Sequence, residues 1–220
     1  MALDLRDAPK NLLKAEEFQP WLSIPTAVIS DDLNRTGAMV SGIKPVAPGM
    51  TFAGQALTIR AFVGDNAAPH YGLTKAWPGC IVVVDARGHT DTAVWGGLLN
   101  YAAKARGAAA IIVDGAIRDI AELRESGIPI YARTSVPNGP QKAWGGGVNV
   151  PIQCGGVSVN PGDILVGDDD GVVVFDPIQR DGLLTLCQAR IAREKGILEK
   201  IDAGKSTVEI MDMPAPDDLG

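Results

Sequence analysis

Three short apolar runs alternate with helix-forming segments in the middle of the chain, and this alternation restricts the fold more than any other feature. The runs cover residues 81–84, 109–113 and 129–132. They are too short for buried helices and consist mainly of Val, Ile and Ala, so we interpret them as buried strands. Asp91 or Thr92 would cap an intervening helix that runs to about Arg106, and 118–126 would form a second helix. Strands that alternate with helices predict βαβ units around a parallel sheet.

The flanking segments predict further strands and helices around these units. Residues 51–61 are rich in β-forming side chains, and the Gly- and Val-rich stretch 134–176 contains turn sequences at 137–139, 160–162 and 170–171. Such turns are typical of β-hairpins. We expect helices over 1–20, on the outside of the molecule, over 25–33 and over 177–203, and a frayed tail from Met213. The expected fold class is α/β, a layered mixed sheet flanked by helices, in one domain over 1–220 with its core at about 20–205.

Charge and cysteine content exclude several classes of partner. Acidic residues outnumber basic ones by 26 to 20, giving a net charge of -6. Nucleic-acid binders and proteins of anionic membrane surfaces need a basic face, so neither partner is expected. The longest uncharged stretch, 143–162, is rich in Gly and is no membrane span, and the charged N-terminus lacks a signal-peptide core. Three widely spaced cysteines without a Cys-x-x-Cys pair indicate reduced thiols, so we expect a cytoplasmic protein.

Two strand-to-helix turns carry the residues with the clearest chemical potential. The first turn contains Gly96-Gly97, and the second contains Arg118-Asp119, with 20 residues between Gly97 and Arg118. In α/β sheets, ligands bind beyond the carboxyl ends of the parallel strands. Both turns are therefore candidates for a shared binding site.

The glycine pair of the first turn has two interpretations. Gly96 and Gly97 permit a close approach of the backbone and would expose the N–H groups of Leu98 and Leu99 to an anion at a helix start. Alternatively, the two glycines only allow close packing of helices. The pair alone does not separate these readings.

The second turn combines a cation with two acids. Arg118 is able to grip a carboxylate with two parallel hydrogen bonds. Asp119 and Glu122 lie three residues apart, on one face of a helical turn, and two such carboxylates suit a hard cation such as Mg²⁺. The alternative is that both acids only stabilise the start of a helix.

Two further residues are weaker candidates. Glu194 falls on the apolar stripe of the expected C-terminal helix, which is formed by Leu184, Cys187, Ile191, Leu198 and Ile201. A carboxylate on such a face lies at a subunit boundary, at a site, or in an ion pair. His70 follows an Asp65-Asn66 turn and is either a pocket residue or an ordinary core or surface histidine.

Taken together, the two turns resemble the regulator-of-ribonuclease-activity-A-like family, which includes the class II 4-hydroxy-4-methyl-2-oxoglutarate aldolases. The family signature is Gly or Asp, twenty residues, Arg-Asp, two residues, then Glu or Asp. Here it reads Gly97, twenty residues, Arg118-Asp119, Ile120-Ala121 and Glu122. The surrounding GGLLNYAAKARGAAAIIVDGAIRD and the later PGDILVGDDDGVVV are also similar to the family.

The resemblance implies a swivelling β/β/α fold in trimers or hexamers, with the site in a cleft between subunits. It implies that Asp119 ligates Mg²⁺ or Mn²⁺, and that Arg118 and the backbone of 96–99 hold a pyruvate-like substrate. A glutamate from the neighbour's C-terminal helix is also implied, and Glu194 matches that place in order and approximate spacing. Some aldolases of the family carry Asp where this chain has Gly97, and the Gly form is similar to members that decarboxylate oxaloacetate.

The expected function is that of a divalent-metal-dependent lyase. It would release pyruvate by retro-aldol cleavage of substrates of the 4-hydroxy-4-methyl-2-oxoglutarate type, by decarboxylation of oxaloacetate, or by both. The alternative is a non-catalytic regulator that binds a ribonuclease of the E type, with an acidic exterior that mimics RNA. A pure binder has no need for Arg118, Asp119 and Glu122, so these residues favour the enzyme.

Overall fold

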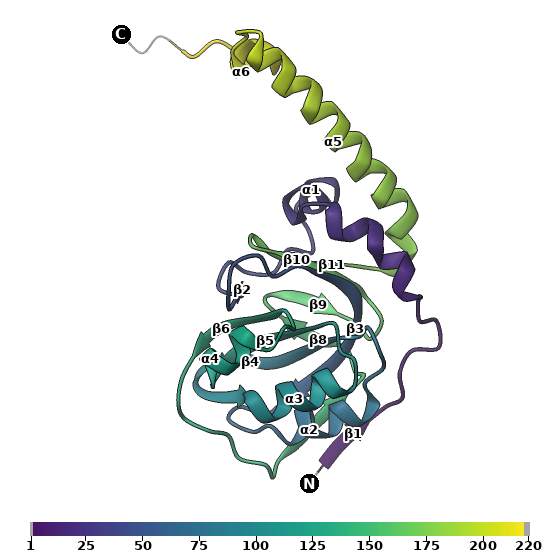
Figure 1. The fold of residues 1–220 in the computed structure, drawn as a ribbon, viewed down its shortest axis with the longest axis vertical. Coiled ribbons are helices and arrows are strands. Elements are labelled where there is room, and N and C mark those ends of the chain that lie inside the picture. The colour runs from purple at the N-terminus through teal and green to yellow at the C-terminus, as the bar shows by residue number, and fades with distance from the viewer. Residues whose placement is uncertain (1, 218–220) are drawn as a thin grey trace.

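A mixed sheet forms the centre of the protein, whose computed structural model describes residues 2–217 (Figure 1). Its strands are β1 (Ala2–Leu5), β2 (Lys44–Pro45), β3 (Phe52–Ala61), β4 (Ile81–Trp95), β5 (Ala110–Ile117), β6 (Ile130–Ser135), β7 (Gly145–Val148), β10 (Ile164–Asp168) and β11 (Gly171–Phe175). The main strand order is β1-β7-β3-β4-β5-β6-β2, and β10 joins β3 and β11 off this path. Strands β3 to β6 are parallel to one another, which confirms the predicted βαβ units.

Helices cover one face of the parallel strands. They are α2 (Ala67–Gly72), η2 (Leu73–Lys75), α3 (Gly97–Ala105) and α4 (Ile120–Glu125). Val82 and Val84 of β4 pack under these helices in one apolar cluster, whereas Ile81 and Val83 belong to the cluster on the opposite face. Successive side chains of a strand point to opposite faces, so a continuous apolar run is buried on both sides.

A second β layer lies on the other face, followed by more helices. The hairpin of β8 (Ile152–Cys154) and β9 (Val157–Val159) packs there with β10 and β11. Beyond them lie η1 (Ala15–Ser23), α1 (Thr26–Asp32) and, after η3 (Pro177–Gln179), the first part of α5 (Arg180–Asp202). A short α6 (Thr207–Ile210) ends the helical part. The α/β fold class, a layered mixed sheet flanked by helices, is thus confirmed.

The predicted helix over 1–20 is wrong. Residues 2–5 form β1, which pairs in parallel with β7, and the helical part of the N-terminal region is the 3-10 segment η1, which contains Pro20. Strand β7 begins with three glycines, so its backbone is open to a neighbouring strand. This pairing over a long sequence separation overrides the helical tendency of a charged segment.

The predicted helix start at Asp91 or Thr92 is also wrong, because β4 continues to Trp95. Register shifts interrupt the pairing of β4 with β5, and both Arg87 and Gly88 have positive φ angles within this irregular stretch. Pairing then resumes, with Trp95 opposite Ile117. Strand β4 therefore contains an irregular, bulged stretch before it pairs with β5 again, and α3 starts only after it, at Gly97.

The C-terminal third follows its prediction only in part. The turn before Gly171 joins β10 to β11 as a hairpin, but 137–139 belongs to a loop and 160–162 connects β9 to β10. The long helix is confirmed as α5, although its second half projects from the body (Figure 1). Residues 213–217 are exposed without regular structure, and the rest of the expected frayed tail lies outside the described residues.

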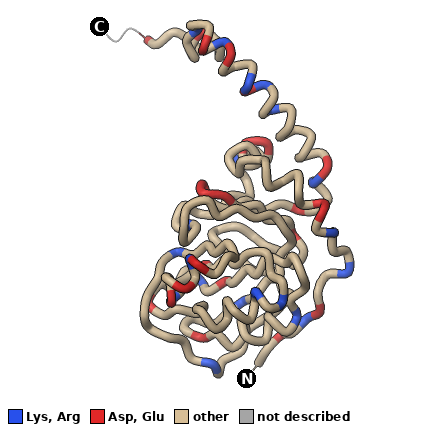
Figure 2. Tube along the Cα trace, viewed as in Figure 1, with Lys and Arg blue, Asp and Glu red and all other residues tan. Residues whose placement is uncertain are grey.

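Charges of both signs are distributed over the surface and along α5 (Figure 2). Arg190 of α5 pairs with Asp32 of α1 at 2.5 Å and fastens the helix to the body. Within residues 2–217, no helix has both the length and the apolar character that crossing a bilayer requires. Cys80, Cys154 and Cys187 are buried with free thiols.

Candidate active site

The two glycine- and arginine-bearing turns meet at the carboxyl ends of β4 and β5. Trp95 at the end of β4 is paired with Ile117 at the end of β5, and the N–H of Arg118 donates to the Trp95 carbonyl at 2.9 Å. The residues that follow each strand are therefore neighbours in space, although 20 residues separate them in sequence. The predicted convergence of the two turns is observed.

Asp119 joins the turns directly. Its Oδ2 accepts a hydrogen bond from the N–H of Gly97, the first residue of α3, at 2.9 Å. Its backbone is left-handed, with φ 61° and ψ 38°, where it precedes α4. Left-handed non-glycine residues are uncommon and gather at functional sites, and Asp tolerates this conformation better than most side chains. The carboxylate is thus held at the start of a neighbouring helix.

Both acids of the second turn approach the glycine pair. A Cβ on Gly96 would lie 2.6 Å from Asp119 Oδ2, and a Cβ on Gly97 would lie 2.6 Å from Glu122 Cδ. Real Cβ atoms essentially never come this close to another heavy atom. The glycines therefore give the two carboxylates the room that they occupy, and the interpretation based only on helix packing does not account for this.

The guanidinium of Arg118 is not committed to a close ion pair with its neighbour. Its Nε lies 3.7 Å from Asp119 Oδ2, beyond hydrogen-bonding distance, and the two side chains are 44% and 42% exposed. A Cβ on Gly139 would lie 2.5 Å from Arg118 Nη1, so the arginine packs against the loop that follows β6. Its donors are available to an anion at the mouth of the site.

The start of α3 supplies further donors. Gly96 is the N-cap residue, and Leu98 and Leu99 belong to the first turn, where backbone N–H groups have no acceptor within the helix. Both leucines line the same small cavity as Arg118 and Asp119. The positive end of the helix dipole and these N–H groups favour an anion.

The lining of this cavity also contains polar residues that the sequence interpretation missed or left open. Asn66 and His70 from the region of α2, and Lys142 from the loop before β7, line the cavity of about 80 Å³ together with the residues of the two turns. His70 is thus a pocket residue, the first of its two interpretations. Lys142 carried no signal, because it lies in an irregular loop without a motif.

Asp65 connects the two segments that carry these polar residues, α2 and the loop before β7. Its buried carboxylate accepts hydrogen bonds from the N–H groups of Ala67 in α2 and of Ala143 and Trp144 in the loop, at 2.8, 2.7 and 3.1 Å. The loop that carries Lys142 is therefore held beside the helix that carries His70. A buried carboxylate that accepts several N–H bonds fixes the position of the backbone around it.

In this part of the lining the positive charge comes from Lys142 alone. Burial, followed by the charge of Lys142, lowers the pKa of His70, so its imidazole is neutral at neutral pH. Asn66 is only 6% exposed, and its Oδ1 has no hydrogen-bond partner among the described residues. A buried polar atom without a partner is costly and is commonly satisfied by a ligand or a water.

The residues of the second turn fit a divalent cation of the magnesium type. Asp119 and Glu122 place two carboxylates beside Gly96 and Gly97. Mg²⁺ is commonly bound through one or two carboxylates, with waters and substrate oxygens completing its coordination. Among the described residues, no three His, Cys, Asp or Glu side chains gather as a complete metal cage. The donor set is that of an open, oxygen-rich site rather than a closed structural one.

Glu194 is not part of this constellation within one chain. It is exposed on the projecting half of α5 and does not line the cavity. Of the apolar stripe that includes it, only Cys187, near the body, is buried, whereas Leu198 is 60% exposed. The prediction that Glu194 completes a site from a neighbouring subunit stays a prediction.

Comparison with known proteins gives a consistent family match. The family described as RraA-like, Aldolase/RraA, matches residues 26–174. A protein of Halalkalibacterium halodurans, provisionally named a 4-hydroxy-4-methyl-2-oxoglutarate aldolase, is 36% identical over 197 residues, which cover 88% of this chain and 94% of that protein. The 4-hydroxy-4-methyl-2-oxoglutarate aldolase of Thermus thermophilus is 39% identical over 124 residues, 56% of this chain and 75% of that protein.

A solved structure carries a different functional name. The RNA-processing inhibitor RraA from Thermus thermophilus is 34% identical, with a TM-score of 0.63, and the match covers 69% of this chain and 92% of that one. Relatives of one fold are thus named both as aldolases and as an inhibitor of RNA processing.

Proposed function

This chain belongs to the RraA-like family, and we propose that it is a divalent-cation-dependent lyase that releases pyruvate from oxo diacids. Suitable substrates are oxaloacetate, which would lose CO₂, and 4-hydroxy-2-oxo diacids of the 4-hydroxy-4-methyl-2-oxoglutarate type, which would undergo retro-aldol cleavage. The observation that carries the proposal is the meeting of Arg118, Asp119 and the start of α3 on one cavity.

The oxo-acid end of the substrate would bind at the two turns. Asp119 and Glu122 would hold Mg²⁺ or Mn²⁺, and such an ion, when bound, supplies Lewis-acid stabilisation of negative charge on the substrate oxygens. Arg118 and the N–H groups of Leu98 and Leu99 provide donors for the C1 carboxylate and the C2 oxygen. Their positions are set by the sheet and by α3 before the substrate arrives, which is the arrangement that makes electrostatic stabilisation effective.

Both reactions place the same demand on this end of the site. The bond between C3 and C4 breaks, and its electron pair moves to C3 and, by conjugation, to the C2 oxygen. Arg118 is placed to stabilise the charge that develops there. In the aldol substrate the C4 hydroxyl also loses a proton to a base, whereas decarboxylation releases CO₂ and needs no base at that step.

The second carboxylate of the substrate would bind to the part of the lining formed by Asn66, His70 and Lys142. Lys142 contributes a positive charge, and neutral His70 and Asn66 contribute hydrogen-bonding groups to the same lining. An oxo diacid presents a carboxylate at each end, so a cavity lined by two cationic side chains, Arg118 and Lys142, matches its charge. A monoacid would lack the interaction with Lys142 that the second carboxylate of a diacid gains.

We further propose that the working enzyme is a homo-oligomer, a trimer or hexamer, with the site at a subunit boundary. Leu98 and Tyr101 on α3 are 78% and 74% exposed directly beside the cavity, and the second half of α5 projects from the body (Figure 1). Covering such side chains is a common reason for association. Glu194 on α5 of a neighbouring copy is the candidate base for the hydroxyl proton of an aldol substrate.

The second candidate function, regulation of an RNA-processing enzyme, is favoured by the name of the Thermus structure. Both candidates are tested by incubating the purified protein with oxaloacetate or 4-hydroxy-4-methyl-2-oxoglutarate, Mg²⁺ or Mn²⁺, lactate dehydrogenase and NADH, with protein-free controls for spontaneous decarboxylation. We expect pyruvate from at least one substrate. No turnover on either, together with a stoichiometric complex with an E-type ribonuclease, would reverse the assignment.

A further inference from the structure

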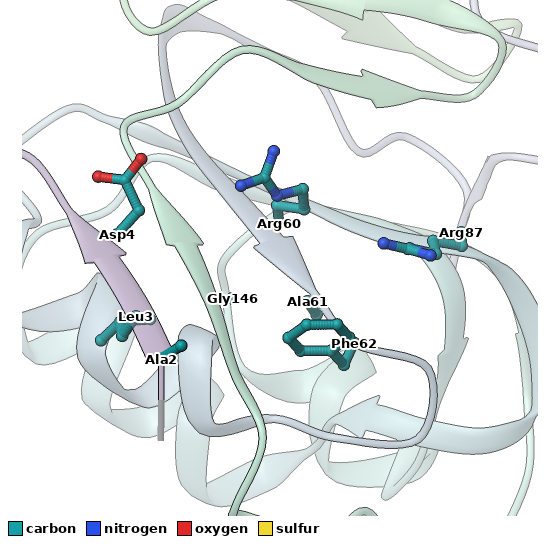
Figure 3. A pocket seen from close by; sticks show the side chains of 8 residues that line it. All are labelled: Ala2, Leu3, Asp4, Arg60, Ala61, Phe62, Arg87 and Gly146. Carbon is teal, nitrogen blue, oxygen red and sulfur yellow. The ribbon is translucent and has the colours of Figure 1, made fainter.

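A second and larger cavity, of about 530 Å³, lies between the end of β3 and the irregular middle of β4, and is distinct from the site just described (Figure 3). Of the residues described, none lines both this cavity and the one that contains Arg118 and Asp119. Its walls come from β1, β7, the end of β3 and the irregular bend of β4, and Figure 3 shows Arg60 and Arg87 on either side of the space above Phe62. Small-molecule sites typically have volumes of about 300–1,000 Å³.

The two arginines bring positive charge that is not neutralised by close ion pairs. Neither Arg60 nor Arg87 forms an ion pair within 4 Å among residues 2–217. The nearby carboxylates are Asp4, which pairs with Arg6 at 2.7 Å, and Asp85, which is buried and accepts the Arg87 N–H through Oδ1 at 2.9 Å. Both acids are therefore already engaged, and the guanidinium groups keep donors for an anion.

The conformation of Arg87 adds a second, independent observation. Its φ angle is 58°, a left-handed value that is uncommon for a side chain of this size. The hydrogen bond to Asp85 holds this backbone in place, and the guanidinium lies 5.9 Å from the centre of the Phe62 ring. Strained residues persist where the surrounding structure fixes them and gather at binding sites. The chain thus holds an arginine at the mouth of a cavity.

The main apolar surface of the lining is Phe62, which is 40% exposed. Ala61 is 1% exposed and Leu3 packs against the core cluster under the helices, so both contribute little apolar surface to the cavity. A free inorganic ion would make no apolar contact with the Phe62 ring. An anion that carries an apolar group would contact both this ring and the two arginines.

We propose that this cavity binds an organic anion, a carboxylate or phosphate group attached to an aromatic or aliphatic body. The anionic group lies between Arg60 and Arg87, and the apolar body covers Phe62. The site is independent of the proposed lyase reaction, which uses none of these residues, so it remains testable in a protein without turnover.

Isothermal titration calorimetry of the full chain tests this site, with phenyl phosphate and benzoate as probes. Inorganic phosphate and phenol, the separated halves of the first probe, serve as controls. We expect saturable binding of at least one of the two probes, and binding at least about tenfold weaker for either half alone. Loss of a charged hydrogen bond should weaken that binding about tenfold in Arg60→Met and in Arg87→Asn.

Matched variants make the result interpretable. Asn is tolerated at positive φ, so Arg87→Asn keeps the backbone conformation. Arg35→Asn is the matched control, because Arg35 also has a left-handed backbone, with φ 62°, and does not line the cavity. Absence of saturable binding, equal affinity for inorganic phosphate or phenol, or undiminished binding by both variants would overturn the proposal.

Discussion

The carboxylate of Glu122 lies in the space that a β-carbon on Gly97 would need, with Glu122 Cδ 2.6 Å from that position. A residue of the first turn and one of the second are therefore sterically coupled. A side chain at position 97 would therefore have to displace the Glu122 carboxylate from its present position.

Replacing Gly97 by Ala should separate function from stability. The added Cβ would push the Glu122 carboxylate away, and displacements of about 1 Å near a reacting centre cost up to about 100-fold in rate. We expect kcat/KM to fall at least about tenfold, without a lower Tm, since Ala is favoured over Gly in helices by up to about 1 kcal/mol. The control is Gly182→Ala in α5, where a Cβ would meet none of the described atoms within 4 Å. Unchanged kcat/KM in Gly97→Ala would show that the position of Glu122 is irrelevant.

Arg118 should contribute to turnover through its charge. Arg118→Met removes the guanidinium at the mouth of the cavity, and we expect kcat/KM for oxaloacetate to fall about 100-fold, the usual effect of removing one preorganised donor. Arg106→Met, which removes an exposed arginine after α3, is the matched control. Steady-state kinetics of both variants decide the matter, and similar losses in the two would argue against a specific role.

Lys142 should distinguish diacids from monoacids. In Lys142→Met the second carboxylate of oxaloacetate loses its partner, so its KM should rise about tenfold or more. Pyruvate, which lacks that carboxylate, should inhibit the variant with an unchanged inhibition constant. Lys10→Met, at an exposed lysine outside the cavity, controls for the loss of charge. If the KM for oxaloacetate and the inhibition constant for pyruvate rose by the same factor in Lys142→Met, the proposal that Lys142 binds the second carboxylate would be contradicted.

His70 should titrate below its ordinary pKa, because burial and the charge of Lys142 both disfavour the imidazolium. NMR titration resolves this directly, since the sequence contains only His70 and His89. Lys142→Met should raise the pKa of His70, and Lys10→Met should leave it unchanged. A pKa of His70 unmoved by Lys142→Met would place the lysine away from the imidazole.

The same shift predicts the direction of a stability change. The unfolded state binds a proton more readily than folded His70 between the lowered pKa and the unfolded value near 6.5. The free energy of unfolding should therefore decrease as the pH falls through that window. Urea denaturation at several pH values measures this free energy for the wild type and for His70→Gln. Its decrease with falling pH should be smaller in the variant, which lacks the contribution of His70.

Local sequence patterns were sufficient for the parallel strands and for the two turns. The runs at 81–84 and 109–113 are apolar on both faces, and the following glycine and arginine turns necessarily lie at one edge of a parallel sheet. The sequence alone therefore predicts that Arg118 and Asp119 lie at that edge.

The errors concern contacts between distant segments. Strand β1 depends on pairing with β7, more than a hundred residues away, and no periodic pattern of apolar residues in its own sequence predicts a strand. Lys142 reaches the cavity because buried Asp65 binds its loop, an interaction that a linear sequence does not reveal. The role of Glu194 is not among these errors and stays a prediction, because the residue lies on a projecting helix and its partner would have to come from another chain.

Asp119→Asn, assayed with and without a chelator, tests the central claim most directly. The substitution keeps the size of the side chain and its hydrogen bond with the Gly97 N–H, but removes the charge that a cation requires. We predict that the wild type releases pyruvate, that EDTA abolishes this release and excess Mg²⁺ or Mn²⁺ restores it, and that Asp119→Asn loses at least about 100-fold in kcat/KM. The account would be contradicted if Asp119→Asn, or the wild type treated with EDTA, released pyruvate at the rate of the untreated wild type.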